Sequence, residues 1–170
     1  MRHKKGLTKI AFVYYSFSAF VKNDYEILSR HFDVIKVNYR RILDAFKIII
    51  AVIKSDISFS WFADGWAFFA VLFSKLFRKK SIVVVGGYDV ACEPQINYGL
   101  CMKNKLRQWM SKFALNNADF LLPVSNNTRT ECFKHLTHPR DLYVLYHGID
   151  TEKFKPGGEK ENNLVITVGG

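Results

Sequence analysis

The feature that most constrains the fold is an apolar run, Ile82–Val85, which two glycines, a tyrosine and an acid follow directly. Four consecutive β-branched residues without polar alternation predict a strand covered on both faces, as in the middle of a parallel sheet. Ligands of open parallel sheets bind where the strands end and the loops begin. The segment Gly86–Asp89 is therefore either part of an active site or a tight turn after a core strand.

The remainder of the chain alternates between patterns typical of strands and patterns typical of helices. Asn23 with Glu26, and Thr128 with Glu131, form capping-box patterns that predict helix starts. The predicted strands are 9–15, 32–39, 56–61, 80–85, 119–124 and 142–146, and the predicted helices are 23–31, 45–54, 66–77, 103–116 and 128–136. This alternation predicts an α/β fold, a three-layer Rossmann-like sandwich with a mostly parallel sheet.

Two of the predicted helices have distinctive surfaces. The helix 45–54 is apolar nearly all round, so we expect it to be deeply buried. The helix 103–116 is amphipathic, with an apolar stripe at i, i+3, i+4 and i+7 spacing formed by Leu106, Trp109, Met110 and Phe113. Lysine and arginine flank that stripe at Lys103, Lys105, Arg107 and Lys112. It is either a core-packing helix with a solvated basic face, which we favour, or a helix lying on an anionic membrane.

Composition narrows the class of protein. The 170 residues suffice for one ordinary domain, and a hydrophobic content of 49% with fifteen Phe and eight Tyr can form a sizeable core. The net charge of +10 favours anionic partners such as nucleic acid, anionic lipid or phosphorylated small molecules. No RNP motif, zinc-finger spacing or arginine-rich tract is present, so nucleic acid is not an expected partner.

Cysteine usage and the N-terminus bear on the cellular compartment. Cys92, Cys101 and Cys132 are too few for a disulfide framework, which favours reduced thiols, with a single Cys92–Cys101 bridge as the alternative. The apolar run 10–21 follows basic residues as in a signal peptide, but no Ala-x-Ala-like site follows it and 10–15 fits a first buried strand. We expect a cytoplasmic protein, with peripheral attachment to a membrane as a second option.

The polar segment near the C-terminus, with Pro156, Gly157 and Gly158, is typical of a linker. An apolar stretch, 164–168, and two glycines follow it. We therefore expect an N-terminal domain over 1–156, a linker over 157–163, and at 164–170 the first strand of a truncated second domain.

Polar side chains stand at the expected carboxyl ends of the strands. They are Ser16, Asp64, Asp89, Ser125, Asn126, His147 and Asp150. Parallel topology brings such ends to one edge of the sheet, where hydroxyls, carboxylates and an imidazole bind hydroxyl-rich ligands and transfer protons. Each residue also has a structural alternative: Ser125 and Asp150 suit turn caps, and His147 an ordinary loop position.

Motifs for other ligand classes are missing from the sequence. It contains no His-Glu-x-x-His, no P-loop and no Gly-x-Gly-x-x-Gly pattern. The first loop, 16–20, has no glycine at all, which argues against a dinucleotide fingerprint there.

Three segments together resemble a known family. Residues 82–89 are similar to a strand that ends in Gly-Gly-x-Asp, and 118–125 (Ala-Asp-Phe-Leu-Leu-Pro-Val-Ser) to a strand that ends in Val-Ser. The most specific is 144–156, which contains His147-Gly148-Ile149-Asp150, then Phe154 and Pro156. In this order, over essentially all 170 residues, the chain resembles the N-terminal domain of a family 4-type glycosyltransferase, one half of the GT-B fold.

The resemblance implies a retaining transfer of a sugar from a nucleotide-sugar donor to a saccharide or lipid-linked acceptor. It implies no metal and no cofactor besides the nucleotide-sugar co-substrate. In that family the N-terminal domain mainly holds the acceptor and the C-terminal domain most of the donor, so this chain alone is expected to be inactive. Charge develops on the leaving diphosphate, which basic groups and backbone N–H groups would stabilise.

The resemblance also assigns roles to single residues. Asp89 is the expected catalytic side chain, and the glycines before it are expected to leave room for the sugar. The expected substrate-binding residues are Ser16, Gly86, Gly87, Ser125, Asn126, His147, Gly148 and Asp150. The chain departs from the family pattern by its Tyr15–Ser18 first loop, by lacking a histidine after the fourth strand, and by lacking a Glu-x7-Glu motif. The alternative function is a non-catalytic module that binds a ligand or a membrane surface.

Overall fold

A computed structural model describes residues 7–138, 140–155 and 157. Its centre is a five-stranded sheet in the order β2-β1-β3-β4-β7, in which every neighbouring pair is parallel. The strands are β1 (Lys9–Tyr14), β2 (Asp33–Asn38), β3 (Ile57–Trp61), β4 (Lys80–Val85) and β7 (Phe120–Pro123). The predicted parallel sheet is confirmed, with β4 inside it between β3 and β7.

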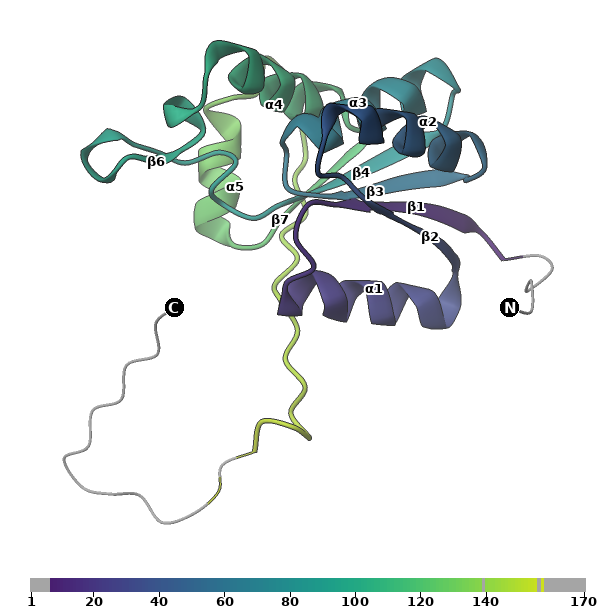
Figure 1. The fold of residues 1–170 in the computed structure, drawn as a ribbon. Helices are drawn as coiled ribbons and strands as arrows, with labels where there is room; N and C mark the ends of the chain where they lie inside the picture. Colours follow the sequence, from purple (N-terminus) through teal and green to yellow (C-terminus); the bar gives the residue numbers. More distant parts are fainter. Residues whose placement is uncertain (1–6, 139, 156, 158–170) are drawn as a thin grey trace.

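Helices cover both faces of the sheet (Figure 1). One face carries α1 (Ala19–His31) and the other carries α2 (Ala45–Ile53), α3 (Gly65–Leu76) and α4 (Lys105–Asn117). The chain continues from β7 into α5 (Asn126–Phe133). Short 3₁₀ turns are η1 (Ile42–Asp44), η2 (Pro94–Ile96) and η3 (Leu100–Met102), and β5 (Cys92–Glu93) pairs antiparallel with β6 (Tyr98–Gly99). The three-layer Rossmann-like architecture is therefore as predicted.

The middle of the sheet is buried on both faces, and β1 and β4 contribute side chains to two apolar clusters, one on each face. Strand β3 contributes Phe59 and Trp61 to the cluster on the α1 side only, because the buried serines Ser58 and Ser60 occupy its other face. In β4, Val83 and Val85 face the α2–α4 layer, whereas Val84 joins the cluster on the α1 side. All three valines are at most 1% exposed. A two-sided core explains why β4 has no polar alternation.

The predicted burial of the helix at 45–54 is wrong. Only Ile48, Ala51 and Val52 of α2 are buried, whereas Phe46 and Ile50 are more than half exposed. The helix packs on α3, β1 and β2 with one side only, so its second apolar side faces outward.

Two helices begin earlier than their capping boxes predict. Helix α1 starts at Ala19, although its N-cap Ser18 makes no side-chain capping bond, and Val21 in its first turn is fully buried. Helix α5 starts at Asn126, after a cap in which Ser125 Oγ accepts from the Thr128 N–H. Burial of Val21 favours the earlier start of α1, and the cap by Ser125 sets the earlier start of α5. Both outweigh the capping-box patterns at Asn23 and Thr128.

Helix α4 fits its predicted pattern only in part. Met110 is buried and Phe113 packs against the core, but Leu106 and Trp109 are more than half exposed. The buried side of α4 instead includes the small residues Ser111 and Ala114, which allow a close approach to α3.

The predicted strand at 142–146 is not formed. The segment makes one backbone hydrogen bond to the sheet, from Leu145 N–H to the Pro123 carbonyl at 2.9 Å. Leu142 is buried, but Tyr143, Leu145 and Tyr146 are more than half exposed, so no layer covers the segment. The predicted strand 164–170, and the linker beyond residue 157, lie outside the described residues. Among the described helices, none has the length and apolar character needed to cross a bilayer.

Of the two cysteine alternatives, the structure has the disulfide. Cys92 and Cys101 are bonded and join β5 to η3, so the prediction of reduced thiols is wrong for this pair. Cys132 of α5 is free and fully buried. Burial raises the pKa of the Cys132 thiol to about 12, which keeps it protonated and unreactive in the folded chain.

We therefore predict no reaction of the native chain with a thiol reagent at mildly alkaline pH. Unfolding without a reductant should expose Cys132 alone, and unfolding after reduction should expose all three cysteines. Counting labelled thiols by mass spectrometry checks both statements. Labelling of Cys92 or Cys101 before reduction would contradict the bridge.

A second prediction concerns how α3 is held on the sheet. Ser74 Oγ of α3 donates to Ser58 Oγ of β3 at 2.8 Å, and both side chains are buried. Ser60, two residues along the same strand, is equally buried, and its hydroxyl has no hydrogen-bond partner in the described part of the chain. We expect Ser58→Ala to lower the free energy of unfolding by about 1–2 kcal/mol, because it leaves Ser74 unpaired.

Ser60→Ala is the matched control and should leave stability unchanged or raise it, since it removes an unsatisfied hydroxyl. Urea unfolding followed by circular dichroism measures both variants. The Ser58→Ala/Ser74→Ala double variant should lose less than the two single losses combined. Equal losses at positions 58 and 60 would refute the assignment.

Candidate functional site

A cavity of about 680 Å³ opens where β1, β3 and β4 end and α4 begins. This volume lies in the range of small-molecule sites, and the edge is the one at which parallel sheets bind ligands. Its lining combines aromatic rings with charged groups. The aromatic residues are Tyr15, Tyr39, Phe62, Trp66 and Tyr88, and the polar ones are Ser16, Arg40, Asp64, Asp89, Lys103 and Arg107.

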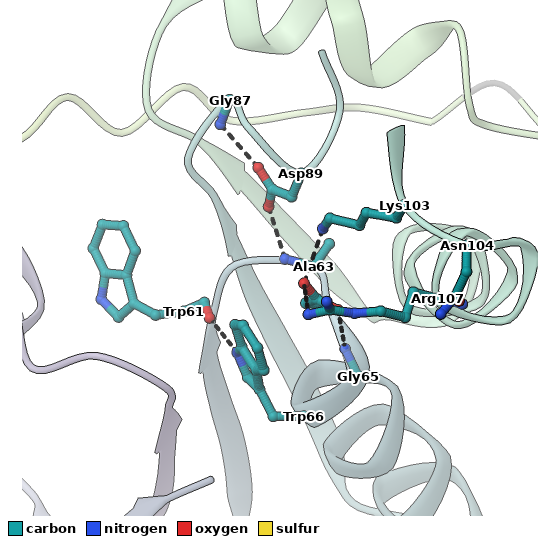
Figure 2. A network of polar contacts seen from close by, with 10 residues as sticks. Trp61, Ala63, Gly65, Trp66, Gly87, Asp89, Lys103, Asn104 and Arg107 are labelled. Atoms are coloured by element: carbon teal, nitrogen blue, oxygen red, sulfur yellow. Dashed lines mark hydrogen bonds and ion pairs between the residues drawn. The ribbon is translucent and has the colours of Figure 1, made fainter. Parts of the chain in front are cut away.

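Asp64 is the hub of the charged groups. Its Oδ1 accepts from the Gly65 N–H at 2.7 Å and so caps α3. Its Oδ2 accepts from Lys103 Nζ at 2.9 Å and from Arg107 Nη2 at 3.2 Å. Figure 2 shows both cations reaching from α4 and the turn before it toward the start of α3. One carboxylate thus joins two helices at the cavity wall.

The two cations at Asp64 differ in exposure. The side chain of Lys103 is 4% exposed, and its ammonium also lies 5.0 Å from the centre of the Tyr88 ring. The side chain of Arg107 is 53% exposed, and Asn104 Oδ1 caps α4 by accepting from the Arg107 N–H. Lys103 therefore neutralises Asp64 inside the wall, whereas Arg107 has donors left for a ligand.

Asp89 braces the loops below this wall. It is 1% exposed, and its two oxygens accept from the N–H groups of Ala63 at 2.7 Å and Gly87 at 2.9 Å (Figure 2). Burial raises the pKa of Asp89, and the two amide bonds oppose that rise. Its carboxylate therefore ties the exit loop of β3 to that of β4. The catalytic role expected for Asp89 stays a prediction.

Aromatic rings form the remaining wall of the cavity. Tyr15 stacks on Trp66, with ring centres 5.4 Å apart and an angle of 17°. The indole N–H of Trp66 donates to the Trp61 carbonyl, which fixes the ring against the end of β3. Flat rings held in this way offer an apolar face, suited to the C–H face of a sugar ring or to a lipid chain.

The two glycines after β4 have separate structural reasons. A Cβ atom on Gly86 would lie 2.1 Å from the ring of Phe62, so that ring fills the space that we expected a sugar to occupy. Gly87 has φ +112°, a conformation that favours glycine, and turns its N–H toward Asp89. A ligand contact at either glycine stays a prediction.

The remaining predicted residues lie away from the cavity. Ser125 caps α5, and Asn126 Nδ2 donates to the Tyr146 hydroxyl at 3.0 Å. Asp150 caps an exposed turn, accepting from the N–H groups of Glu152 and Lys153. Their structural alternatives are thus realised, while their binding roles stay untested.

His147 belongs to a different cluster, on the α1 side of the sheet. Its ring packs against both Phe20, at 5.3 Å, and Trp61, at 5.4 Å, and these two rings also contact each other at 5.0 Å. Gly148 follows it, beside the amide of Asn23. Burial raises the pKa of the neighbouring Asp24, and the charge of His147 opposes that rise. Of the predicted site residues, Ser16 and Asp89 line the cavity together with Asp64, and His147 does not.

Sequence reasoning missed the cavity's cations and most of its rings. Lys103 and Arg107 have i, i+4 spacing, but the sequence pattern favours a solvated basic face for the predicted helix 103–116. In the structure Lys103 precedes α4. The signal in the sequence was Asp64 itself. A carboxylate directly after an apolar strand is expected to be buried, and a buried carboxylate needs a cation such as Lys103 or Arg107. Among the described residues, no cluster of three or more His, Cys, Asp or Glu could hold a metal ion.

Asp89→Ala provides a test of the bracing contact. It would leave the buried N–H groups of Ala63 and Gly87 unpaired, so the free energy of unfolding should fall by about 2 kcal/mol or more. Asp150→Ala is a matched control, because its carboxylate also accepts from two backbone N–H groups but is exposed. Urea midpoints compare the two. Similar small losses in both variants would contradict the bracing role.

Comparison with known proteins identifies structures that share this fold. No protein-family model matches the chain, and no curated protein sequence matches it. Two solved structures are similar: the S. aureus MnaA–UDP complex, at 11% identity with a TM-score of 0.52, and a UDP-N-acetylglucosamine 2-epimerase, at 10% identity with a TM-score of 0.50. Each comparison covers 75% of this chain, and 40% and 45% of the respective neighbours. The chain therefore has the Rossmann-like fold of one part of a GT-B-type protein and spans less than half of its neighbours' length.

Proposed function

We propose that this chain is the acceptor-binding domain of a GT-B-type enzyme that transfers a sugar, with retention, from a nucleotide-sugar to a saccharide or lipid-linked acceptor. The observation that carries the proposal is the aromatic cavity at the carboxyl ends of β1, β3 and β4, with cations at its wall. The resemblance of the 144–156 connector to glycosyltransferases supports it, as does the fold. A neighbour solved with UDP is consistent with a nucleotide-sugar co-substrate.

The chemistry of the cavity favours an acceptor that carries an anionic group. Arg40, Lys103 and Arg107 line it against two carboxylates, Asp64 and Asp89. Both carboxylates are almost fully buried. The two oxygens of Asp89 also accept hydrogen bonds from the backbone N–H groups of Ala63 and Gly87. The half-exposed guanidinium of Arg107 can therefore bind a phosphate oxygen, as in a lipid-linked or phosphorylated sugar.

In this proposal the chain binds and orients the acceptor. The rings of Tyr15 and Trp66 would hold its apolar part, and Arg107 its anionic group. Fixing both would point one hydroxyl toward the donor, which lowers the entropic part of the barrier. Asp89, tied to the loops after β3 and β4, would keep the wall rigid.

The proposal is tested with this chain joined to the donor-binding domain that the proposal requires. Labelled nucleotide-sugars are supplied with and without a lipid-phosphate acceptor, and the products are separated by chromatography. We expect a glycosylated product only when the acceptor is present. Epimerisation of the sugar without any acceptor would favour an epimerase instead. If the protein binds none of the nucleotide-sugars, the enzyme proposal is rejected in favour of a non-catalytic binding module.

Arg107→Gln tests the residue assignment in the same assay. It removes one charged hydrogen bond to the acceptor, so KM for the acceptor should rise roughly tenfold with little change in kcat. Lys103 continues to neutralise Asp64, so the fold should persist. Lys105→Gln removes a neighbouring exposed cation of α4 outside the cavity and should behave as wild type. Equal effects of both variants would indicate a general charge effect.

A further inference from the structure

An apolar stripe is exposed along η1 and α2, on the side of these elements that faces away from the sheet. Ile42, Phe46, Ile50 and Ile53 recur at helical spacing, and Leu43 lies beside them. They are 50–68% exposed, whereas Ile48, Ala51 and Val52 on the opposite side of α2 are buried. We call the five exposed residues the α2 face. Contiguous exposed apolar surface of this kind marks an interaction site.

Cations surround the α2 face. Arg40, Arg41, Lys47 and Lys54 line a groove of about 880 Å³ that runs between β2 and α2, and Leu43 and Ile50 border the same groove. Lys36 also lines the groove, but its ammonium packs on the Phe17 ring, 3.4 Å from the ring centre, and is therefore not available to a partner. The groove thus joins apolar side chains to a set of available positive charges.

The one acid between residues 40 and 54, Asp44, neutralises only one of these four cations. Asp44 Oδ2 accepts from the N–H groups of Arg40 and Arg41, both at 2.9 Å, and Oδ1 pairs with Lys47 at 2.6 Å. These bonds hold the pKa of Asp44 below its usual range. Asp44 therefore fixes the turn before α2, and the three remaining cations have no carboxylate partner within the segment.

We propose that the α2 face docks on a membrane surface that contains anionic lipid. Apolar side chains ringed by Lys and Arg match the boundary between acyl chains and acidic headgroups. A second copy of the chain is a poorer occupant, because two molecules of net charge +10 would bring their basic rims together. The proposed surface is that of α2, whereas the sequence pattern offered the helix 103–116 as the membrane-binding alternative to a core-packing helix.

The α2 face adjoins the cavity. Arg40 and Ile42 line the cavity, and both belong to the α2 face or its basic rim. A docked chain would thus present the cavity at the membrane surface, where the phosphate of a lipid-linked acceptor lies. This last step rests on the proposed function, whereas membrane docking does not.

Vesicle flotation with the 170-residue chain tests the docking. The probes are phosphatidylcholine vesicles with and without about 30 mol% phosphatidylglycerol. We expect binding to the anionic vesicles, weaker at high salt, and at least about tenfold less to neutral ones, since the three cations Arg40, Arg41 and Lys54 meet the headgroups. Phe46→Glu should weaken binding to anionic vesicles about tenfold or more, and Arg41→Glu roughly fivefold.

Ile96→Glu is the matched control. Ile96 is 72% exposed and lies on η2, the turn that connects β5 to β6. Figure 1 shows β6 at the opposite end of the molecule from α2. It should bind like wild type, and circular dichroism should show all variants folded, because each changed side chain is exposed.

Three results would overturn the proposal: no binding to anionic vesicles, equal loss in Phe46→Glu and Ile96→Glu, or loss in Trp109→Glu with none in Phe46→Glu. Self-association that depends on Phe46, without vesicle binding, would assign the face to a second copy. Flotation needs no nucleotide-sugar, so its failure and a failure of sugar transfer are observed separately.

Discussion

The buried carboxylate of Asp64 is the interaction on which the candidate site depends. It caps α3, binds Lys103 and Arg107, and so fixes α4 over the end of β3. A buried charge is costly unless it is paired, and a cap, an ammonium and a guanidinium together satisfy this one. Without them the edge of the sheet would lack its basic wall beside the rings of Tyr15 and Trp66.

The second buried carboxylate, Asp89, solves the same problem differently. Its partners are backbone N–H groups from two loops, so it adds rigidity without recruiting a cation. Two neighbouring acids thus have distinct tasks: one organises side chains at the cavity, and the other holds the loops that shape it. The cations left for a ligand are Arg107 and Arg40, which is the charge that the proposed anionic acceptor would require.

Part of the site could be anticipated from sequence because parallel strands end at a common edge. Ser16, Asp64 and Asp89 follow β1, β3 and β4, and all three line the cavity. Ser125 and Asn126 follow β7 but bind the start of α5 and Tyr146, and His147 packs against Phe20 and Trp61. Position after a strand places a residue at the edge, whereas the direction of its side chain depends on neighbours that are distant in sequence.

The sequence by itself determined the layered α/β fold, because runs such as Ile82–Val85 are stable only inside a sheet covered on both sides. It also determined most helix and strand positions, through local periodicity. Only the tertiary structure decided which apolar side of α2 is buried, that Phe62 fills the space beside Gly86, and that Lys103 is buried against Asp64. Each of these depends on packing between segments far apart in the chain, and local patterns carry no information about such partners.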